Sequence, residues 1–208
     1  PNLRVEWDDH SLDTVLDGLA LESKWTFNIP SLARRVEGIS GGHLIVVGAR
    51  PNTGKTSFHA SLVAADGGFA HQGAKCIILC NEEGYRRVAS RYISASSLMT
   101  VKEALQNKAL ANKRYYPVSK NILIKDSTGK GMDWVESVVK YEKPDIVILD
   151  MGDKFADIRS ERTDITLKAA AIHARNIAKQ YDCAVMWMSQ LSAEAEGRAD
   201  LNQAMMEG

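Results

Sequence analysis

The stretch GARPNTGKTS, residues 48–57, follows the apolar run HLIVV and precedes a segment with helical periodicity. Residues 49–56 fit the phosphate-loop pattern G-x-x-x-x-G-K-[ST], except that Ala49 stands in place of the first glycine. Alanine is the smallest substitute and Gly48 precedes it, so the tight turn of the loop remains feasible. A strand before the loop and a helix after it are the context in which this pattern binds phosphate. The stretch therefore predicts a site for a nucleoside triphosphate.

The residues of this loop have distinct expected tasks. Backbone N–H groups point at phosphate oxygens, and Gly54 lets the backbone come close to them. Lys55 is the cation that reaches the β and γ phosphates, and the Thr56 hydroxyl faces Mg²⁺. The predicted nucleotide-binding residues are Ala49, Arg50, Pro51, Asn52, Thr53, Gly54, Lys55, Thr56 and Ser57.

Apolar runs bounded by turn signals recur along the chain and alternate with segments of helical periodicity. Most of the apolar runs are continuous, as expected of strands that are buried on both faces. The expected strands are residues 43–48, 76–80, 121–126, 145–150 and 183–189. The expected helices are residues 55–71, 84–110, 131–142 and 164–181, with Thr163 as the N-cap of the last. This alternation predicts an α/β fold, a mainly parallel central sheet flanked by helices.

A carboxylate at the end of a neighbouring strand is needed as a second anchor for Mg²⁺. The run DIVILD ends in Asp150, which we predict to fill that position. Many phosphate-loop ATPases carry their catalytic glutamate directly after this aspartate, whereas here Met151 follows. The general base must therefore come from another strand.

The second and last strands deliver further polar groups to the same carboxyl edge of the sheet. CNEEGYRR places Glu82 and Glu83 there, and we prefer Glu82 as the base that orients and deprotonates the attacking water. WMSQL places Gln190 there, where its amide can hydrogen-bond the γ phosphate. Glu82, Lys55 and Gln190 form the predicted catalytic set.

Composition excludes several classes of protein. Lys and Arg together number 26 and so do Asp and Glu, so no net charge attracts the chain to nucleic acid or to an anionic membrane. No apolar run approaches the roughly 18 residues needed to span a bilayer. We therefore expect a soluble protein, no membrane partner, and nucleic-acid contact through local loops alone.

Cysteine and histidine spacing argues against a zinc centre. The three cysteines, Cys76, Cys80 and Cys183, form no CxxC pair and lie in apolar runs, so we expect reduced thiols in the core. The five histidines show no ligand spacing, so we predict no zinc; they are His10, His43, His59, His71 and His173.

The chain divides into a short N-terminal part and a core. Leu12, Val15, Leu16 and Leu19 are spaced as one face of a short helix. That face can pack on its own domain or on a neighbour, and the sequence leaves both open. We assign residues 1–28 to a linker or helical segment and residues 29–208 to the core.

With these residues in place, the sequence resembles the RecA-like ATPases, and within them the DnaB-type replicative helicases and the helicase halves of phage primase-helicases. The phosphate loop is close to the family's A-R-P-S-M-G-K-T, and the lead-in IPSL…GISGG, residues 29–42, looks like that of the superfamily. EEGYRRVASR resembles the motif of the catalytic glutamate, which places Glu82 on that residue and Arg91 on an arginine further along the helix. ILD and SQLS match the metal aspartate and the sensor glutamine.

The resemblance implies the ATP-hydrolysing motor domain of a replicative DNA helicase, with ATP and Mg²⁺ as cofactors, in the cytoplasm of a bacterial or phage-infected cell. It also implies a ring, usually hexameric, with ATP between subunits and single-stranded DNA in the central channel. An arginine finger from the adjacent subunit contributes about 10³ to 10⁵ in rate in related phosphoryl-transfer systems. The family carries this arginine in further strands beyond residue 208, so we expect the core here to be incomplete at its C-terminal end.

RecA-like folds place their DNA loops after the metal-aspartate strand and after the sensor strand. These correspond to MGDKFADIRSERTD, with Lys154, Arg159 and Arg162, and to the last segment, with Arg198. Basic residues there would contact phosphates without reading sequence. The alternative is an exposed loop of mixed charge. Phe155 can stack on a base or serve as a packing anchor.

Two other functions remain open on the sequence. One is another RecA-like ATPase, of recombination or repair. The second is a module that binds ATP to assemble with partners and hydrolyses it little, against which the Glu82 constellation argues.

Overall fold

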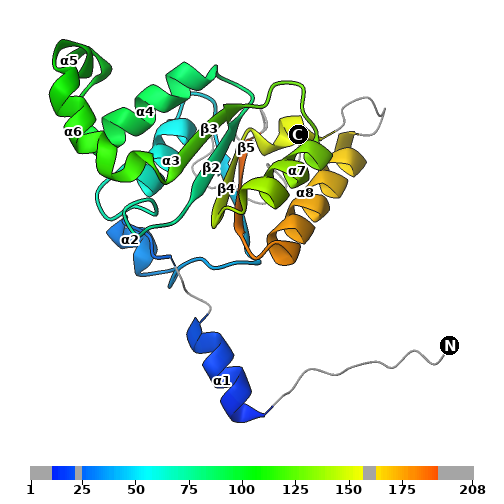
Figure 1. The fold of residues 1–208 in the computed structure, drawn as a ribbon. Helices are drawn as coiled ribbons and strands as arrows, with labels where there is room; N and C mark the ends of the chain where they lie inside the picture. The colour runs from blue at the N-terminus through cyan, green and yellow to red at the C-terminus, as the bar shows by residue number, and fades with distance from the viewer. Residues whose placement is uncertain (1–10, 22–24, 157–162, 192–208) are drawn as a thin grey trace.

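Five strands form one sheet in which all neighbours run parallel, in the order β1-β5-β4-β2-β3 (Figure 1). The strands are β1 Leu44–Ala49, β2 Cys76–Cys80, β3 Ile122–Asp126, β4 Ile146–Asp150 and β5 Ala184–Gln190. The structure is a computed structural model, and it describes residues 11–21, 25–156 and 163–191. Each strand lies within one residue of a predicted run, which confirms the parallel α/β fold.

Helices cover both faces of the sheet. The helices in the described part of the chain are α1 Leu12–Leu21, α2 Pro30–Ala33, α3 Lys55–Ala64, α4 Tyr85–Ser97, α5 Val101–Gln106, α6 Lys108–Ser119, α7 Met132–Glu142 and α8 Thr163–Gln180, with a 3₁₀ turn η1 at Gly152–Phe155. Figure 1 shows α3, α4 and α6 on one face and α7 and α8 on the other. Strands covered in this way must be apolar on both faces.

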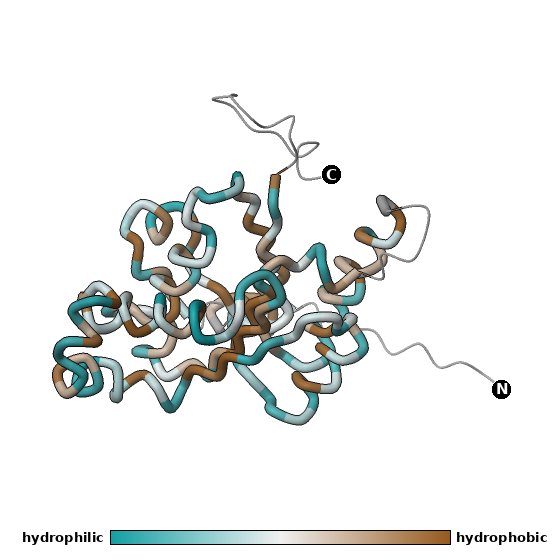
Figure 2. The backbone as a smooth tube through the Cα atoms, turned by 90° about the horizontal axis from the view of Figure 1, so that it is seen from above, coloured by the Kyte–Doolittle hydropathy of each residue, from teal (hydrophilic) through white to brown (hydrophobic). Residues whose placement is uncertain are grey.

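Alternate residues of the central strands enter two separate cores. In β2, Ile78 packs with α3 and α4, whereas Ile77 and Leu79 pack with α7 and α8. Every residue of β2 and β4 is buried. Figure 2 shows these hydrophobic segments gathered in the middle of the molecule, between more hydrophilic outer turns. This two-sided burial is the physical reason for the continuous apolar runs.

Two predicted helices have different bounds in the structure. The helix expected over 55–71 ends at Ala64, and Gly68 follows in a turn so tight that a Cβ would lie 2.7 Å from the Val63 carbonyl oxygen. The helix expected over 84–110 is three helices and continues to Ser119. Leu98 ends α4 in the left-handed conformation with φ 55°, and Thr100 begins α5 with a capping box to Glu103. Hydrophobic periodicity continues across such breaks because it reflects the spacing of apolar side chains and not the backbone dihedrals.

The residues that the structure describes leave the apolar face of α1 exposed. Its predicted residues are exposed, from 42% for Val15 to 71% for Leu12. Among the described residues, no helix is long and apolar enough to cross a membrane.

The three cysteines are buried free thiols, as predicted. Burial raises the pKa of Cys80 and of Cys183 to about 11 and raises that of Cys76 further. Since the thiolate is the reactive species, we expect the folded chain to react with a disulfide reagent far more slowly than a free thiol at pH 8. Ellman titration measures this, with the same chain in denaturant as the control. Rapid labelling of the folded chain would contradict the burial described here.

Candidate nucleotide-binding site

The loop between β1 and α3 is bent by residues in the left-handed conformation. Asn52 has φ 59° and Gly54 has φ 94°. A Cβ on Gly54 would meet nothing within 4 Å, so the glycine is favoured by its dihedral and not by space. The Thr53 hydroxyl donates to the Arg50 carbonyl at 2.7 Å and closes the turn. Such turns aim successive N–H groups into a concavity that binds anions.

Helix α3 begins directly after this turn, at Lys55. Its N-cap, Gly54, has no side chain to accept hydrogen bonds from the first turn. The N–H groups of that turn and the positive end of the helix dipole therefore favour an anion at this position.

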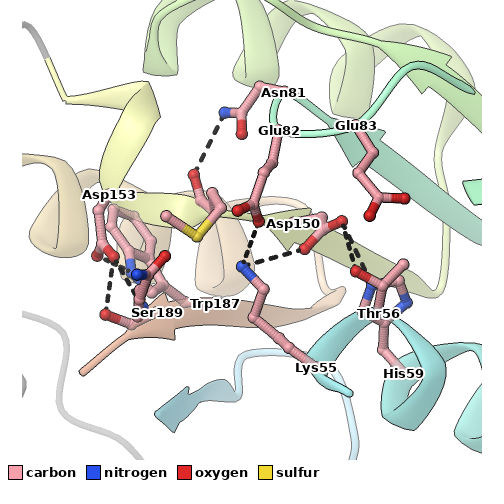
Figure 3. Close-up of polar contacts among 12 residues, drawn as sticks. Lys55, Thr56, His59, Asn81, Glu82, Glu83, Asp150, Asp153, Trp187 and Ser189 are labelled. Atoms are coloured by element: carbon pink, nitrogen blue, oxygen red, sulfur yellow. Dashed lines mark hydrogen bonds and ion pairs between the residues drawn. The ribbon is translucent and has the colours of Figure 1, made fainter. Parts of the chain in front are cut away.

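Lys55 lies between two carboxylates from different strands (Figure 3). Its Nζ donates to Glu82 Oε2 at 3.0 Å and is 3.5 Å from Asp150 Oδ1. Glu82 follows β2 and Asp150 ends β4, and these strands pair in register with Cys80 opposite Asp150. The parallel sheet thus brings both acids to the loop that follows β1.

Asp150 is fully buried, and polar groups of α3 surround it. Thr56 Oγ1 donates to its Oδ2 at 3.4 Å, and His59 Nε2 is 3.6 Å from the same oxygen. Burial opposes ionisation, but the facing His59 imidazole and the Lys55 ammonium outweigh it and hold the pKa of Asp150 below its ordinary value. Asp150 is therefore a carboxylate at neutral pH.

The Thr56–Asp150 pair suits a hard divalent cation. Both residues offer oxygen, and among the described residues Asp150 Oδ1 has no hydrogen-bond partner. In the part of the chain that the structure describes, no three His, Cys, Asp or Glu side chains gather as ligands. A cation held here would therefore take its other ligands from phosphate and water, as Mg²⁺ commonly does.

The two glutamates after β2 have different partners. Glu82 faces Lys55, whereas Glu83 accepts from Arg91 Nη2 at 2.7 and 2.9 Å. Arg91 lies on α4, so Glu83 is tied to that helix and Glu82 is directed at the phosphate loop. The assignment of Glu82 as general base stays a prediction.

The end of β5 is fastened to the turn that follows β4. Asp153 accepts hydrogen bonds from Trp187 Nε1 at 2.9 Å, Ser189 Oγ at 2.8 Å and the Gln190 backbone N–H at 3.3 Å. Gly152 lies against the Trp187 ring, where a Cβ would be 2.3 Å from the nearest ring atom. This bracing places Gln190 at the edge of the sheet beside Ala49, its partner in β1.

These groups line one cleft of about 280 Å³. Its walls are Ala49, Arg50, Pro51, Asn52, Gly54, Lys55, Thr56, Ser57, Glu82, Glu83, Arg91 and Gln190. Of the predicted nucleotide and catalytic residues, Thr53 alone is not part of the lining, and Asp150 is buried below Lys55 and Thr56. The fold thus gathers the predicted site residues from four strand ends.

The predicted DNA residues are only partly described. Lys154 is exposed in η1, while Arg159, Arg162 and Arg198 lie outside the described residues. Phe155 is 1% exposed and packs in the core beneath α7 and α8. The alternative in which Phe155 stacks on a base is therefore wrong, and the packing-anchor interpretation holds.

Sequence reasoning missed three polar residues around the site. Asp153 lies in the loop of mixed charge after β4 and carried no assignment of its own. Asn81, which donates to the Met151 carbonyl at 3.2 Å, and His59, beneath Asp150, carried no assignment. No motif marks these positions, because their partners lie on distant segments.

The geometry and topology define a class, the RecA-like α/β domain with a phosphate loop. The chain matches the family described as the DnaB-like helicase C terminal domain over residues 26–206, and it belongs to that family.

One solved structure adds a comparison of fold. It is described as "The Structure Of A DnaB-Like Replicative Helicase And Its Interactions With Primase" and superimposes with a TM-score of 0.79 at 19% identity. The match covers 97% of this chain and 55% of that chain, so this chain spans about half the length of that helicase. A comparison with curated protein sequences found no match.

Proposed function

We propose that this chain is the ATP-hydrolysing motor domain of a replicative DNA helicase, which uses Mg-ATP at subunit interfaces to translocate on single-stranded DNA and unwind duplex. The observation that carries the proposal is the cleft in which Lys55, Glu82 and Gln190 meet from separate elements. Membership of the DnaB-like family supports the same conclusion.

Some residues of the site bind the nucleotide and others take part in proton transfer. The loop N–H groups and Lys55 would hold the phosphates, and Thr56 with Asp150 would hold the cation, which would neutralise charge on the phosphates. Lys55 pairs with Glu82 in the structure. When a phosphate competes for Lys55, Glu82 loses this partner and becomes available to accept a proton from water. Gln190 then contacts the γ phosphate from β5.

The proposal includes three further features. The domain assembles into a hexameric ring, contacts single-stranded DNA, and receives an arginine finger from a neighbouring subunit. Arg50 and Arg91 are the arginines among the described residues that line the cleft, and the proposed finger is a further arginine from another subunit. Lys154, exposed at the same edge, is the described candidate for a phosphate contact with DNA.

The test is ATP hydrolysis by the full-length protein, with Mg²⁺, in the presence and absence of single-stranded DNA. We expect DNA to raise turnover by roughly tenfold, which corresponds to about 1.4 kcal/mol in the barrier. Duplex DNA of the same length is the control. Equal turnover without DNA would indicate another RecA-like ATPase, and tight binding of ATP without hydrolysis would indicate an assembly module.

A further inference from the structure

His59 is a fully buried histidine on α3, placed behind the carboxylate that ends β4 (Figure 3). Its Nδ1 lies 2.8 Å from the hydroxyl oxygen of Tyr92 on α4. Its Nε2 lies 3.6 Å from Asp150 Oδ2 and, among the described residues, has no hydrogen-bond partner. The His59 imidazole takes part in none of the proposed steps of nucleotide binding and hydrolysis.

The contacts with Tyr92 and with the Asp150 carboxylate together determine which ring nitrogen carries hydrogen. Burial raises the pKa of the Tyr92 phenol well above its ordinary value, so the hydroxyl keeps its proton and can donate to Nδ1. A neutral His59 then carries its hydrogen on Nε2, and a protonated one carries hydrogen on both nitrogens. In either form an N–H group is directed at Asp150. The other tautomer would set a lone pair against the carboxylate.

The three polar neighbours of Asp150 differ in what nucleotide does to them. Lys55 and Thr56 line the cleft, and the proposed function gives them to the phosphates and the cation. His59 is buried in the core and does not line that cleft. It therefore remains beside Asp150 whether or not nucleotide is bound.

We propose that His59 is a positioning residue, which holds the Asp150 carboxylate in the orientation that receives a divalent cation, with Tyr92 setting the imidazole. A carboxylate turns easily about its last bond, so a fixed donor behind one oxygen determines where the other points. The inference rests on the proposed function, because it takes Asp150 as a cation ligand.

The test measures cation affinity directly, with Mn²⁺ as a paramagnetic probe and ADP present, by electron paramagnetic resonance. His59→Asn keeps an amide near the Nδ1 position, within reach of Tyr92, and removes the donor that faces Asp150. His59→Gln carries its amide N–H to the Nε2 position. We expect His59→Asn to weaken Mn²⁺ binding by about 10- to 100-fold, and His59→Gln to remain near wild type. ADP affinity without divalent cation should not change in either variant.

Two further variants keep the test decisive. His173→Asn, on α8, is the control for replacing a histidine and should bind Mn²⁺ as wild type does. Tyr92→Phe keeps the ring and removes the hydroxyl, so it should weaken Mn²⁺ binding without altering cation-free ADP binding. Should His59→Asn fail to fold in a thermal melt, unchanged Mn²⁺ affinity in Tyr92→Phe overturns the inference.

The outcomes separate this inference from the proposed function. Equal Mn²⁺ affinity in wild type, His59→Asn and His59→Gln overturns the role of His59 and leaves the proposed function standing. Equal losses in His59→Asn and His59→Gln also overturn it, because a packing effect would then suffice. Failure of wild type to bind Mn²⁺ with ADP overturns both.

Discussion

Replacement of Lys55 by alanine is expected to abolish nucleotide binding at micromolar concentrations. The Lys55 ammonium lies between the two carboxylates of the cleft, 3.0 Å from Glu82 Oε2 and 3.5 Å from Asp150 Oδ1. Its removal takes away the phosphate partner and leaves two carboxylates facing the incoming anion. Loss of one partner of a buried, hydrogen-bonded charge pair costs about 3 kcal/mol, or roughly 100-fold in affinity. Titration with a fluorescent ADP analogue measures it.

The control for this variant is Lys75→Ala. Lys75 pairs with Glu142 at 2.8 Å, away from the cleft, so its loss removes a lysine without touching the nucleotide. A thermal melt of Lys55→Ala is also needed, because Asp150 is buried and loses a counter-charge in that variant. Affinity within a few fold of wild type, in a folded Lys55→Ala protein, would remove the phosphate role of this lysine.

Glu82→Gln is expected to retain nucleotide binding and to lose hydrolysis. The amide oxygen of glutamine can still accept from Lys55 Nζ, so the loop geometry is kept, but an amide does not take a proton from water. General-base catalysis contributes about 10² to 10⁴ in rate, which sets the expected fall in turnover. Steady-state hydrolysis and equilibrium ATP binding, measured on the same preparation, separate the two effects.

Glu83→Gln is the matched comparison, one residue along the chain. Its carboxylate is engaged by Arg91 at 2.7 Å, so we expect a smaller effect on turnover than in Glu82→Gln. Normal turnover in Glu82→Gln together with loss in Glu83→Gln would move the base to Glu83. Normal turnover in both would place it outside these two residues.

Much of the fold follows from local sequence. The strands are continuous apolar runs because both faces of β2 and β4 are buried, and such runs are visible without any knowledge of pairing. The periodicity predicts one helix over residues 84–110 because Leu98 at φ 55° and the caps at Thr100 and Asn107 interrupt the helix without disturbing that periodicity. Local chemistry at single residues decided those boundaries.

Some residues of the candidate site could likewise be predicted from local sequence, whereas others could not. The phosphate loop, the aspartate at the end of β4 and the glutamates after β2 could be read from the sequence, because each is a short motif at the end of an apolar run. The sequence alone thus determined a parallel α/β fold with a phosphate loop. Only the tertiary structure decided that Glu82 faces Lys55 while Glu83 faces Arg91, that Asp153 braces β5, and that His59 lies behind Asp150. These contacts join residues far apart in the chain, and the strand order β1-β5-β4-β2-β3 that brings them together has no local signature.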